Sequence, residues 1–392
     1  MIIAVICPYI LTPQIQEKLG IRVEDYTRAT GTINLSLGLS KIPGVDVHQI
    51  SMTRHIRGTK LVRDGNINIH FVGIPPKLTS FTFLQYPKML VHRELKKIKP
   101  DIVHGHHAET GDPYYAITSN YRSIAGIHNY LPMLMKITGQ PSLSTMAIFR
   151  HFEKYTIKNA SHITVDSRYI GEIISPLTTA KIHRIPNCVH SDFFNHSKVD
   201  YDSKTDGRLT IAFFGQLRRE KGLEILMDAL PLIREKIHEV VLKVIGNTTE
   251  LSMSKIVNRS RYLGVANNVA FLGWMEWDQI IQELRNTDLV VTPSIYEPFG
   301  CTVVEGMAMG LPVLGSRTGG IKENIVDGET GVLFEVGNSK DLAEKAIWLL
   351  KEDGLRKKIG IKAAEYAKRA FHPDVVAAQH LRLYQSICSS MN

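Results

Sequence analysis

Residues Thr292–Val313 read TPSIYEPFGCTVVEGMAMGLPV and contain the most informative pattern of the chain. The apolar run that enters this stretch, Leu289–Thr292, predicts a short buried strand. A loop with proline and glycine follows it, and the pattern after Gly300 is helical. A strand, a tight loop and a helix in this order indicate a βα unit of a parallel sheet.

This βα unit also predicts a phosphate site. Gly300, Cys301 and Thr302 fall at the expected helix N-terminus, where unpaired backbone N–H groups and aligned peptide dipoles favour an anion such as a diphosphate. Glu305 lies about one turn further on, where a carboxylate can accept the hydroxyl protons of a ribose. Glu297, in the loop before the helix, can then reach the group beyond the phosphates, which would be a sugar.

The stretch resembles glycosyltransferase family 4, whose Glu-x7-Glu signature corresponds to Glu297 and Glu305 in an intact EPFG sequence. The resemblance implies that Phe299 and Gly215 belong to the donor site. It continues in the family's order through Phe213-Phe214-Gly215 to Lys221-Gly222, Val244-Ile245-Gly246, Phe271-Leu272-Gly273, Thr318-Gly319-Gly320 and Gly328-Glu329-Thr330-Gly331. Ordinary Rossmann loops would explain any one of these segments, but explain the ordered set poorly.

The resemblance further implies a lysine and an arginine that neutralise the departing diphosphate. Lys221 matches the lysine, but Gln216 stands at the usual arginine position. Arg218 or Arg219 can supply the missing donors to phosphate oxygens, and we favour Arg219. The alternative is that both arginines are solvated loop charges.

The N-terminal half resembles the family less closely. A histidine at the end of a strand contacts the transferred sugar in the family, and His128 matches it, although a histidine there can also be structural. Gly31 matches the family's glycine loop only in part, because Thr32 follows in place of a second glycine. Gly31 can let the backbone approach the donor, or Thr32 can simply be a helix N-cap. The landmarks of this half are Lys99-Pro100-Asp101-Ile102-Val103-His104, Gly126-Ile127-His128-Asn129, Val165-Asp166-Ser167 and Ile185-Pro186-Asn187.

A run of potential metal ligands follows one predicted strand. In an extended strand His104 and His106 share one face and His107 points away, so we expect acceptor contact rather than a metal site. We expect no metal and no cofactor, with the nucleotide sugar as a substrate. The run consists of His104, His106, His107, Glu109 and Asp112.

Alternating strand and helix patterns appear in two series, which predict two parallel sheets. The first series comprises the strands Ile2–Cys7, Asp46–Ile50, Ile67–Val72, Asp101–His104, Ile124–His128 and Ile163–Val165, with a helix over Thr79–Lys97. The second comprises the strands Leu209–Phe214, Val240–Ile245, Val269–Leu272, Leu289–Thr292 and Val313–Gly315, with helices over Leu223–Ile237 and Asp278–Leu284.

The predicted fold class is therefore α/β, with two Rossmann-like domains, and the resemblance implies that they face each other across a cleft (GT-B). We expect an acceptor-binding domain over residues 1–195 and a nucleotide-sugar-binding domain over 208–372. A final helix within 373–392 is expected to return to the first domain. The polar stretch His196–Arg208 reads as the linker, so its Asp200-Tyr201-Asp202 is interpreted as a solvated loop rather than a metal–diphosphate motif.

Composition limits the partners. The chain has 392 residues and a net charge of +9, which favours negatively charged partners such as phosphates or anionic membranes, and no nucleic-acid motif is present. The four cysteines show no CxxC spacing, and the apolar N-terminus lacks the basic leader and cleavage site of a signal peptide. We expect a cytoplasmic protein, with possible peripheral contact at the inner face of the membrane.

The segment Leu131–Ala160 supports that membrane contact, because it holds four basic residues and one acid, Glu153, among apolar ones. An ordinary helical insertion on the sheet would look the same. The basic residues are Lys136, Arg150, Lys154 and Lys158, and Arg93, Lys96, Lys97 and Lys99 lie upstream.

Taken together, the motifs predict a retaining, metal-independent hexosyltransferase that uses a nucleotide diphosphate sugar, with UDP favoured and GDP next. Its acceptor would be a glycan, a lipid or a small molecule. Two rivals remain: a sugar-nucleotide epimerase or hydrolase on the same fold, and a non-catalytic protein that binds nucleotide sugars or anionic lipids.

Overall fold

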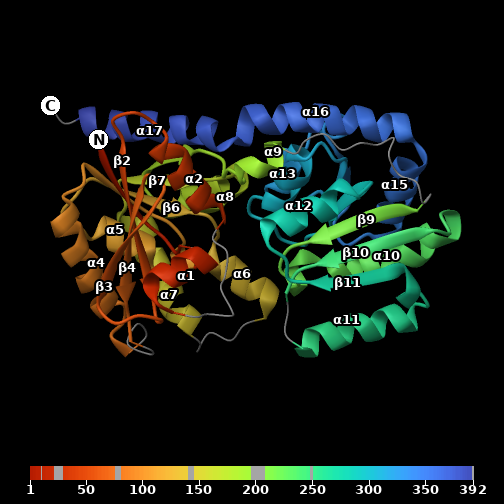
Figure 1. Cartoon of the computed structure of the whole chain (residues 1–392), viewed down its shortest axis with the longest axis horizontal. Coiled ribbons are helices and arrows are strands. Elements are labelled where there is room, and N and C mark those ends of the chain that lie inside the picture. The colour runs from red at the N-terminus through yellow and green to blue at the C-terminus, as the bar shows by residue number, and fades with distance from the viewer. Residues whose placement is uncertain are drawn as a thin grey trace. The chain divides into compact units, whose positions relative to one another are not determined.

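The computed structural model describes residues 1–9, 11–21, 30–75, 81–139, 145–195, 208–247 and 250–390. The chain divides into two compact units, Met1–Cys188 with Pro373–Asn392, and Val189–His372. Each unit contains a mainly parallel sheet covered by helices (Figure 1). The expected fold class of two Rossmann-like α/β domains is confirmed.

The sheet of the first unit has the strand order β3-β4-β2-β1-β5-β6-β7-β8. Neighbouring strands are parallel except β3 and β4, which form an antiparallel pair. The strands are β1 (Ile2–Ile6), β2 (Asp46–Thr53), β3 (Thr59–Asp64), β4 (Ile67–Gly73), β5 (Ile102–Gly105), β6 (Ser123–Ile127), β7 (His162–Val165) and β8 (Lys181–Arg184). The helices are α1 (Pro13–Leu19), α2 (Thr30–Ser40), α4 (Gln85–Ile98), α5 (Asp112–Ile117), α6 (Leu131–Thr138), α7 (Thr145–Asn159), α8 (Arg168–Ile174) and α17 (Pro373–Ser389).

The two outer strands of this sheet were not predicted. Only Val62 of β3 is buried, and no residue of β8 is fully buried. Edge strands with one solvated face carry no continuous apolar run, so the sequence pattern of a buried parallel strand is absent from them.

The last helix, α17, returns to the first unit as expected and packs on α2. Gly38 makes this close packing possible, because a Cβ there would lie 2.7 Å from the carbonyl oxygen of Pro373. The C-terminal segment thereby completes the core of the N-terminal sheet.

The second unit contains a fully parallel sheet with the order β11-β10-β9-β12-β13-β14. Its strands are β9 (Leu209–Phe214), β10 (Val240–Ile245), β11 (Val269–Gly273), β12 (Leu289–Thr292), β13 (Val313–Ser316) and β14 (Val332–Phe334). Its helices are α9 (Ser191–Asn195), α10 (Leu223–Lys236), α11 (Glu250–Tyr262), α12 (Trp277–Arg285), α13 (Cys301–Ala308), α14 (Ile321–Asn324), α15 (Ser339–Lys351) and α16 (Asp353–Phe371). The sequence did not predict β14, which is only three residues long.

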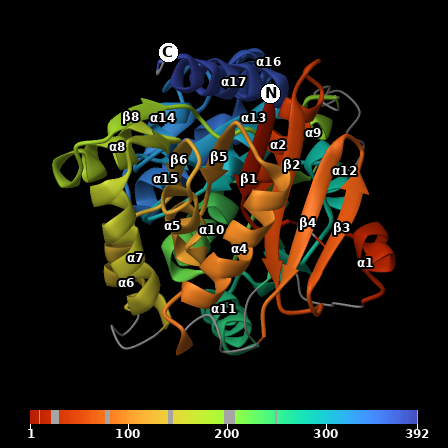
Figure 2. The ribbon, with the colours of Figure 1, turned by 90° about the vertical axis from the view of Figure 1, so that its left-hand side faces the viewer.

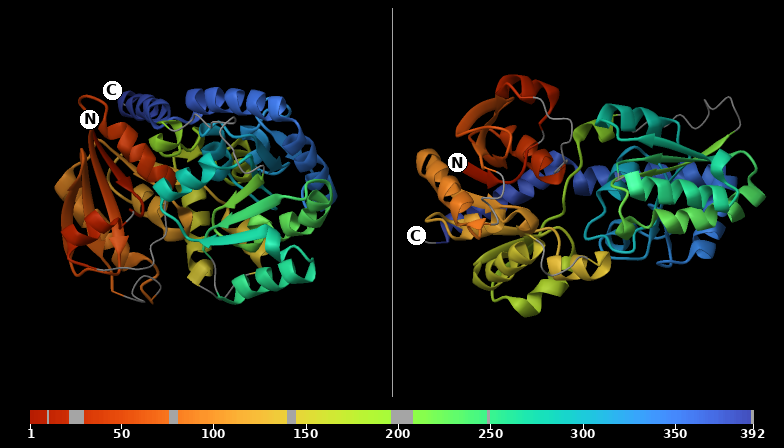
Figure 3. Two further views of the ribbon diagram at one scale, coloured as in Figure 1. Left: turned by 45° about the vertical axis from the view of Figure 1, so that its right-hand side comes forward. Right: turned by 90° about the horizontal axis from the view of Figure 1, so that it is seen from below.

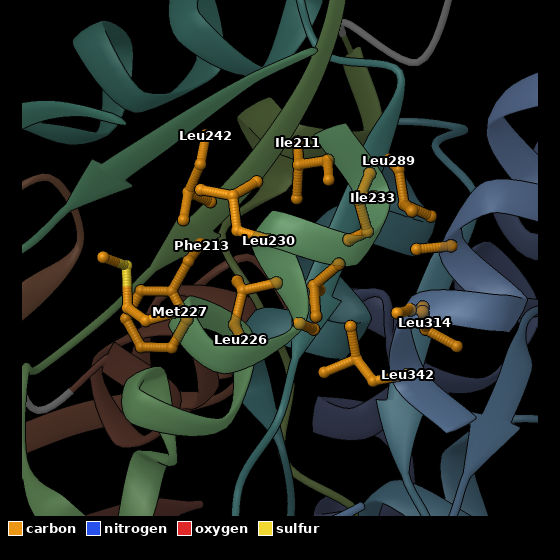
Figure 4. Close-up of a cluster of buried hydrophobic side chains, with 14 of the residues drawn as sticks. Ile211, Phe213, Leu226, Met227, Leu230, Ile233, Leu242, Leu289, Leu314 and Leu342 are labelled. Carbon is orange, nitrogen blue, oxygen red and sulfur yellow. The ribbon is translucent and has the colours of Figure 1, made fainter. Parts of the chain in front are cut away.

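Both faces of this second sheet are buried, and β9 shows how. Ile211 and Phe213 face a cluster with α10 and α15 (Figure 4), whereas Ala212 and Phe214 face a cluster with α12, α13 and α16. Helices therefore cover the sheet on both sides (Figure 3). This double burial explains why β9 is a continuous apolar run.

The boundary between the units lies after Cys188, where the sequence suggested residue 195. Val189, Phe193 and Phe194 pack into the core of the second unit beside α13, so α9 belongs there. The predicted linker residues 196–207, with Asp200-Tyr201-Asp202, lie outside the described residues. The segment Leu131–Ala160 forms two helices, α6 and α7, rather than one.

Candidate active site

The predicted phosphate loop lies beside β9 and β12, the neighbouring strands at which the strand order of the second sheet reverses. Crevices at such a switch point are where ligands bind in open α/β sheets. Two loops meet there. The backbone amide of Ile295 donates to the carbonyl of Glu220 at 2.8 Å, and a Cβ on Gly222 would lie 1.9 Å from the carbonyl oxygen of Pro293. The loop after β9 and the loop after β12 therefore form one structure.

Lys221 and Glu297 are brought together by these loops. Nζ of Lys221 lies 2.7 Å from Oε2 of Glu297, and the hydroxyl of Ser294 donates to the same oxygen at 3.2 Å. The Lys221 side chain is 29% exposed and that of Glu297 is 9% exposed. The sequence motifs assign the lysine to a phosphate and the glutamate to a sugar, but they do not predict that the two side chains pair.

The pairing sets the charge of the lysine. Burial lowers the pKa of Lys221, but the adjacent Glu297 carboxylate outweighs burial and holds this pKa above its ordinary value of 10.5. Lys221 is therefore cationic at neutral pH, and it presents a fixed positive charge next to the first turn of α13.

The first turn of α13 has the predicted geometry of a helix N-terminus. Gly300 is its N-cap, with a left-handed φ of 96°, and the helical hydrogen bonding begins with the amide of Val303, which donates to the Gly300 carbonyl at 3.1 Å. Gly215 faces this turn from the end of β9, because a Cβ there would lie 3.5 Å from Cγ2 of Thr302. Gly215, Lys221 and residues 300–302 thus surround one small region.

The other predicted donor residues differ in what they present. The Phe299 ring is buried in the core against Phe371, with 5.8 Å between ring centroids, so this residue can offer a ligand only its backbone. Glu305 lies on α13 and is buried. Arg218 and Arg219 are both exposed, and Nη1 of Arg218 lies 3.9 Å from Oε1 of Glu220.

In the first unit, His128 follows β6 and takes part in a chain of hydrogen bonds. Its Nδ1 lies 3.0 Å from Oδ2 of Asp166, and its Nε2 lies 2.8 Å from Nδ1 of His106. Asn187 donates to the same oxygen of Asp166 at 2.7 Å. Because a carboxylate only accepts hydrogen bonds, Nδ1 of His128 carries a proton and Asp166 fixes the orientation of the ring.

Within this hydrogen-bonded series of side chains, two buried atoms have no hydrogen-bond partner among the described residues. They are Nε2 of His106 and Oδ1 of Asp166. Both side chains line a pocket that also includes His128, Asn187 and Gly31. Unpaired buried polar atoms are costly in a folded protein, so a single hydroxyl or water-sized group in this narrow pocket would relieve that cost.

The histidine run after β5 differs from its prediction. The strand ends at Gly105, and His107 has a left-handed φ of 66°. His107 therefore does not point away as it would in an extended strand, and its ring centroid lies 5.0 Å from that of His128. Burial, followed by the neighbouring histidines, lowers the pKa of His104 and of His106 well below the ordinary value, so both are neutral at neutral pH.

Helix α2 begins at Thr30, so Thr32 lies inside the helix and the N-cap interpretation of this residue is wrong. Its hydroxyl lies 3.3 Å from Nε2 of His107. Gly31 lies next to Asn187, because a Cβ on Gly31 would lie 2.5 Å from Oδ1 of that residue. The glycine thus permits the approach of a side chain that holds Asp166.

Two residues of this pocket, Asp166 and Asn187, were not predicted as site residues, whereas His106 belongs to the run expected to contact the acceptor. Both residues lie within family landmarks, and Asp166 directly follows an expected strand, which was the available signal. Within the described ranges no group of three or more His, Cys, Asp or Glu side chains has the arrangement of a metal site. None of the helices in these ranges combines the length and hydropathy needed to cross a bilayer.

Known families and relatives match most of the chain. The family model "Glycosyl transferases group 1" matches residues 199–366, and "Glycosyltransferase Family 4" matches residues 29–193. An uncharacterized glycosyltransferase of Methanocaldococcus jannaschii is 28% identical over 78% of this chain and 81% of its own length. The N-acetyl-alpha-D-glucosaminyl L-malate synthase of Bacillus anthracis is 24% identical over 94% of this chain and 97% of its own.

Solved structures share the fold. Sucrose-phosphate synthase from Thermosynechococcus elongatus aligns with a TM-score of 0.82 at 17% identity, covering 99% of each chain. Anabaena HepE, in complex with UDP and glucose, aligns with a TM-score of 0.73 at 17% identity, covering 98% of this chain and 99% of its own.

The fold and the two family models define the protein as a GT-B glycosyltransferase, an enzyme that transfers glycosyl groups. The chain belongs to the family 4 type of these enzymes.

Proposed function

We propose that the protein is a retaining, metal-independent hexosyltransferase that moves a sugar from a nucleotide diphosphate donor, UDP first and GDP next, to an acceptor hydroxyl in glycan or glycolipid synthesis. One observation carries the proposal: a lysine held cationic by Glu297 stands beside the N-terminus of α13. Both features attract a diphosphate.

In this account the second unit binds the donor. Lys221 and the backbone amides of residues 300–302 hold the diphosphate, and the Glu305 carboxylate accepts hydrogen bonds from the ribose hydroxyls. When the phosphate arrives, Lys221 turns part of its hydrogen bonding from Glu297 to phosphate oxygens, and Glu297 becomes available to the sugar hydroxyls. Because the lysine and the helix N-terminus already supply positive charge, a divalent cation is not required for the diphosphate to leave.

The choice of UDP draws support from Anabaena HepE, whose structure of the same fold holds UDP and glucose. A hydroxyl acceptor draws support from the pocket of the first unit, where His106 and Asp166 have unpaired atoms among the described residues. In our proposal His128, oriented by Asp166, positions the transferred sugar.

Retention is proposed to occur without a covalent intermediate. Glu297 accepts from Lys221 and, in this proposal, from the sugar hydroxyls, and Asp166 accepts from His128 and Asn187, so neither is poised as a nucleophile. The bond between the anomeric carbon and the diphosphate oxygen breaks, the acceptor oxygen attacks on the same face, and the acceptor proton passes to the departing phosphate.

The test is a panel of UDP-, GDP- and ADP-sugars incubated with the protein in EDTA, with and without a lipid extract as the acceptor source. We expect release of one nucleoside diphosphate, undiminished by EDTA, and a product with the anomeric configuration of the donor. Loss of turnover in EDTA would contradict metal independence, and an inverted product would contradict retention. Absence of turnover with every donor would favour a non-catalytic binding protein. Conversion of one donor without any acceptor would favour an epimerase or a hydrolase.

A further inference from the structure

Helices α4 and α7 of the first unit both pack against the buried helix α5, which lies between them (Figure 2). Tyr114 of α5 connects them. On one side Nε2 of Gln85 donates to its hydroxyl at 3.2 Å and Nζ of Lys88 lies 5.6 Å from its ring centroid. On the other side its ring centroid lies 4.5 Å from that of Phe152 and 5.6 Å from that of Tyr155.

The charges that α4 and α7 present to solvent are all positive. Each helix contains one acid, and both acids are buried. Glu94 accepts from Thr59 and Lys97, and Glu153 accepts from the backbone amide of Leu131. The exposed basic residues at this surface are Arg93, Lys96 and Lys97 of α4, Lys99 directly after it, and Lys154 and Lys158 of α7.

Large apolar side chains of the same two helices, and of the turn before α4, are also exposed. Phe81 is 81% exposed and Phe83 is 62% exposed in the turn before α4, and Met89 of α4 and Tyr155 of α7 are also exposed. Phe83 and Leu84 both have positive φ values, 46° and 61°, a strained conformation for two bulky residues. This turn buries Leu84 completely while it leaves Phe83 in solvent.

We infer that this basic and aromatic surface docks on a membrane that contains anionic phospholipid. Lysine and arginine attract the negative headgroups, while exposed aromatic side chains enter the boundary between headgroups and acyl chains. A second copy of this chain would bring two positive surfaces together, which disfavours it as the occupant. The inference goes beyond the proposed transfer reaction and uses none of its site residues.

The experiment measures sedimentation of the full chain with two kinds of vesicle, phosphatidylcholine alone and phosphatidylcholine mixed with phosphatidylglycerol. We expect binding to the mixed vesicles only, weakened by added salt. The variant Lys96→Glu/Lys154→Glu/Lys158→Glu should lower the affinity for mixed vesicles at least about tenfold. A matched control, Lys358→Glu/Lys368→Glu/Arg369→Glu on exposed positions of α16, makes the same change of net charge in the other unit and should bind like the wild type.

A second variant reports on the aromatic residues. Phe81→Trp should show a blue shift of its fluorescence with mixed vesicles and none with phosphatidylcholine, and circular dichroism should show that every variant is folded. Equal loss of binding in both charge variants, or no binding of the wild type, would overturn the proposal. Light scattering without vesicles measures the mass of the protein in solution. A doubled mass of the wild type that Lys96→Glu/Lys154→Glu/Lys158→Glu, the α4/α7 variant, abolishes would also overturn the proposal in favour of self-association. Release of nucleoside diphosphate in solution should be unchanged in the α4/α7 variant, so a failure of the donor assay and a failure of vesicle binding are separate results.

Discussion

Nζ of Lys221 lies 2.7 Å from Oε2 of Glu297, and this pair joins the loop after β9 to the loop after β12. Removal of the cation in Lys221→Met would leave Glu297 largely buried without its partner and the diphosphate without a fixed positive charge. We expect the transfer rate to fall by roughly a hundredfold to a thousandfold. The melting temperature should fall as well, because an uncompensated buried charge is destabilising.

The matched control for this prediction is Lys243→Met. It removes a lysine that lies 2.8 Å from Oε2 of Glu283 in the same unit but outside the proposed site. Transfer by this variant should stay close to that of the wild type. If both variants lost activity equally, the effect of Lys221→Met would be one of stability alone.

Alanine substitution at two glycines of the second unit distinguishes the cost of backbone strain from the cost of a clash between two loops. Gly222 and Gly264 share a φ of 68°, but a Cβ on Gly264 would meet no atom within 4 Å, whereas one on Gly222 would lie 1.9 Å from the Pro293 carbonyl oxygen. Gly264→Ala should cost about 1 kcal/mol of unfolding free energy. Gly222→Ala should cost about 1 to 3 kcal/mol more, and it should also lower donor affinity. Denaturant unfolding of the two variants measures the difference, and equal losses would contradict the close meeting of these loops.

The buried histidines of the first unit predict a loss of stability in acid. Burial lowers the pKa of His380 from 6.5 to about 4, and the pKa values of His104 and His106 are also lowered, by burial first. Between these folded values and 6.5 the unfolded chain binds more protons than the folded chain, so the stability is complete above 6.5 and falls as pH drops below it. Each such histidine contributes a slope of up to about 1.4 kcal/mol per pH unit.

This slope is measured by denaturant unfolding at several pH values between 7 and 4.5. His380→Gln should show a shallower fall than the wild type, because one group that titrates differently in the two states has been removed. Parallel curves for the two proteins would show that His380 does not contribute to the pH dependence.

Arg219 is the candidate for the family arginine that Gln216 replaces. Since both arginines are exposed but Arg218 lies near Glu220, we expect Arg219→Gln to lower kcat/KM for the donor about tenfold or more. Arg218→Gln should change it much less. The opposite ranking in donor-dependence assays would assign the role to Arg218, and no effect of either would leave both as solvated charges.

The sequence predicted most of the strands that are buried on both faces and the loops after them, but not the three-residue strand β14. Strands such as β9 and β12 are short apolar runs, and the Pro- and Gly-rich loop before α13 has a distinct pattern, so both could be recognised. The edge strands β3 and β8 have no such pattern because one face meets solvent. They are held by pairing with the strand next to them in sequence, β3 with β4 as an antiparallel hairpin and β8 with β7, rather than by an apolar run of their own.

The side-chain pairs of the candidate site were less predictable for a related reason. The Lys221–Glu297 contact depends on two loops meeting, and the contact of His107 with His128 depends on a single left-handed residue after β5. Asp166 orients His128 only because β6 and β7 are neighbours in the sheet. Motif spacing identified the residue types at the strand ends, but strand order and loop conformation decide which of them touch.

The most direct test of the account is calorimetric titration of UDP into the wild-type protein and into Lys221→Met, both in EDTA. The account predicts that UDP binds the wild type without metal, that uridine binds much more weakly because it lacks the diphosphate, and that Lys221→Met loses at least about tenfold in affinity for UDP. Binding that requires a divalent cation, or equal affinity of the two proteins for UDP, would contradict the central claim that Lys221 and the N-terminus of α13 hold the diphosphate.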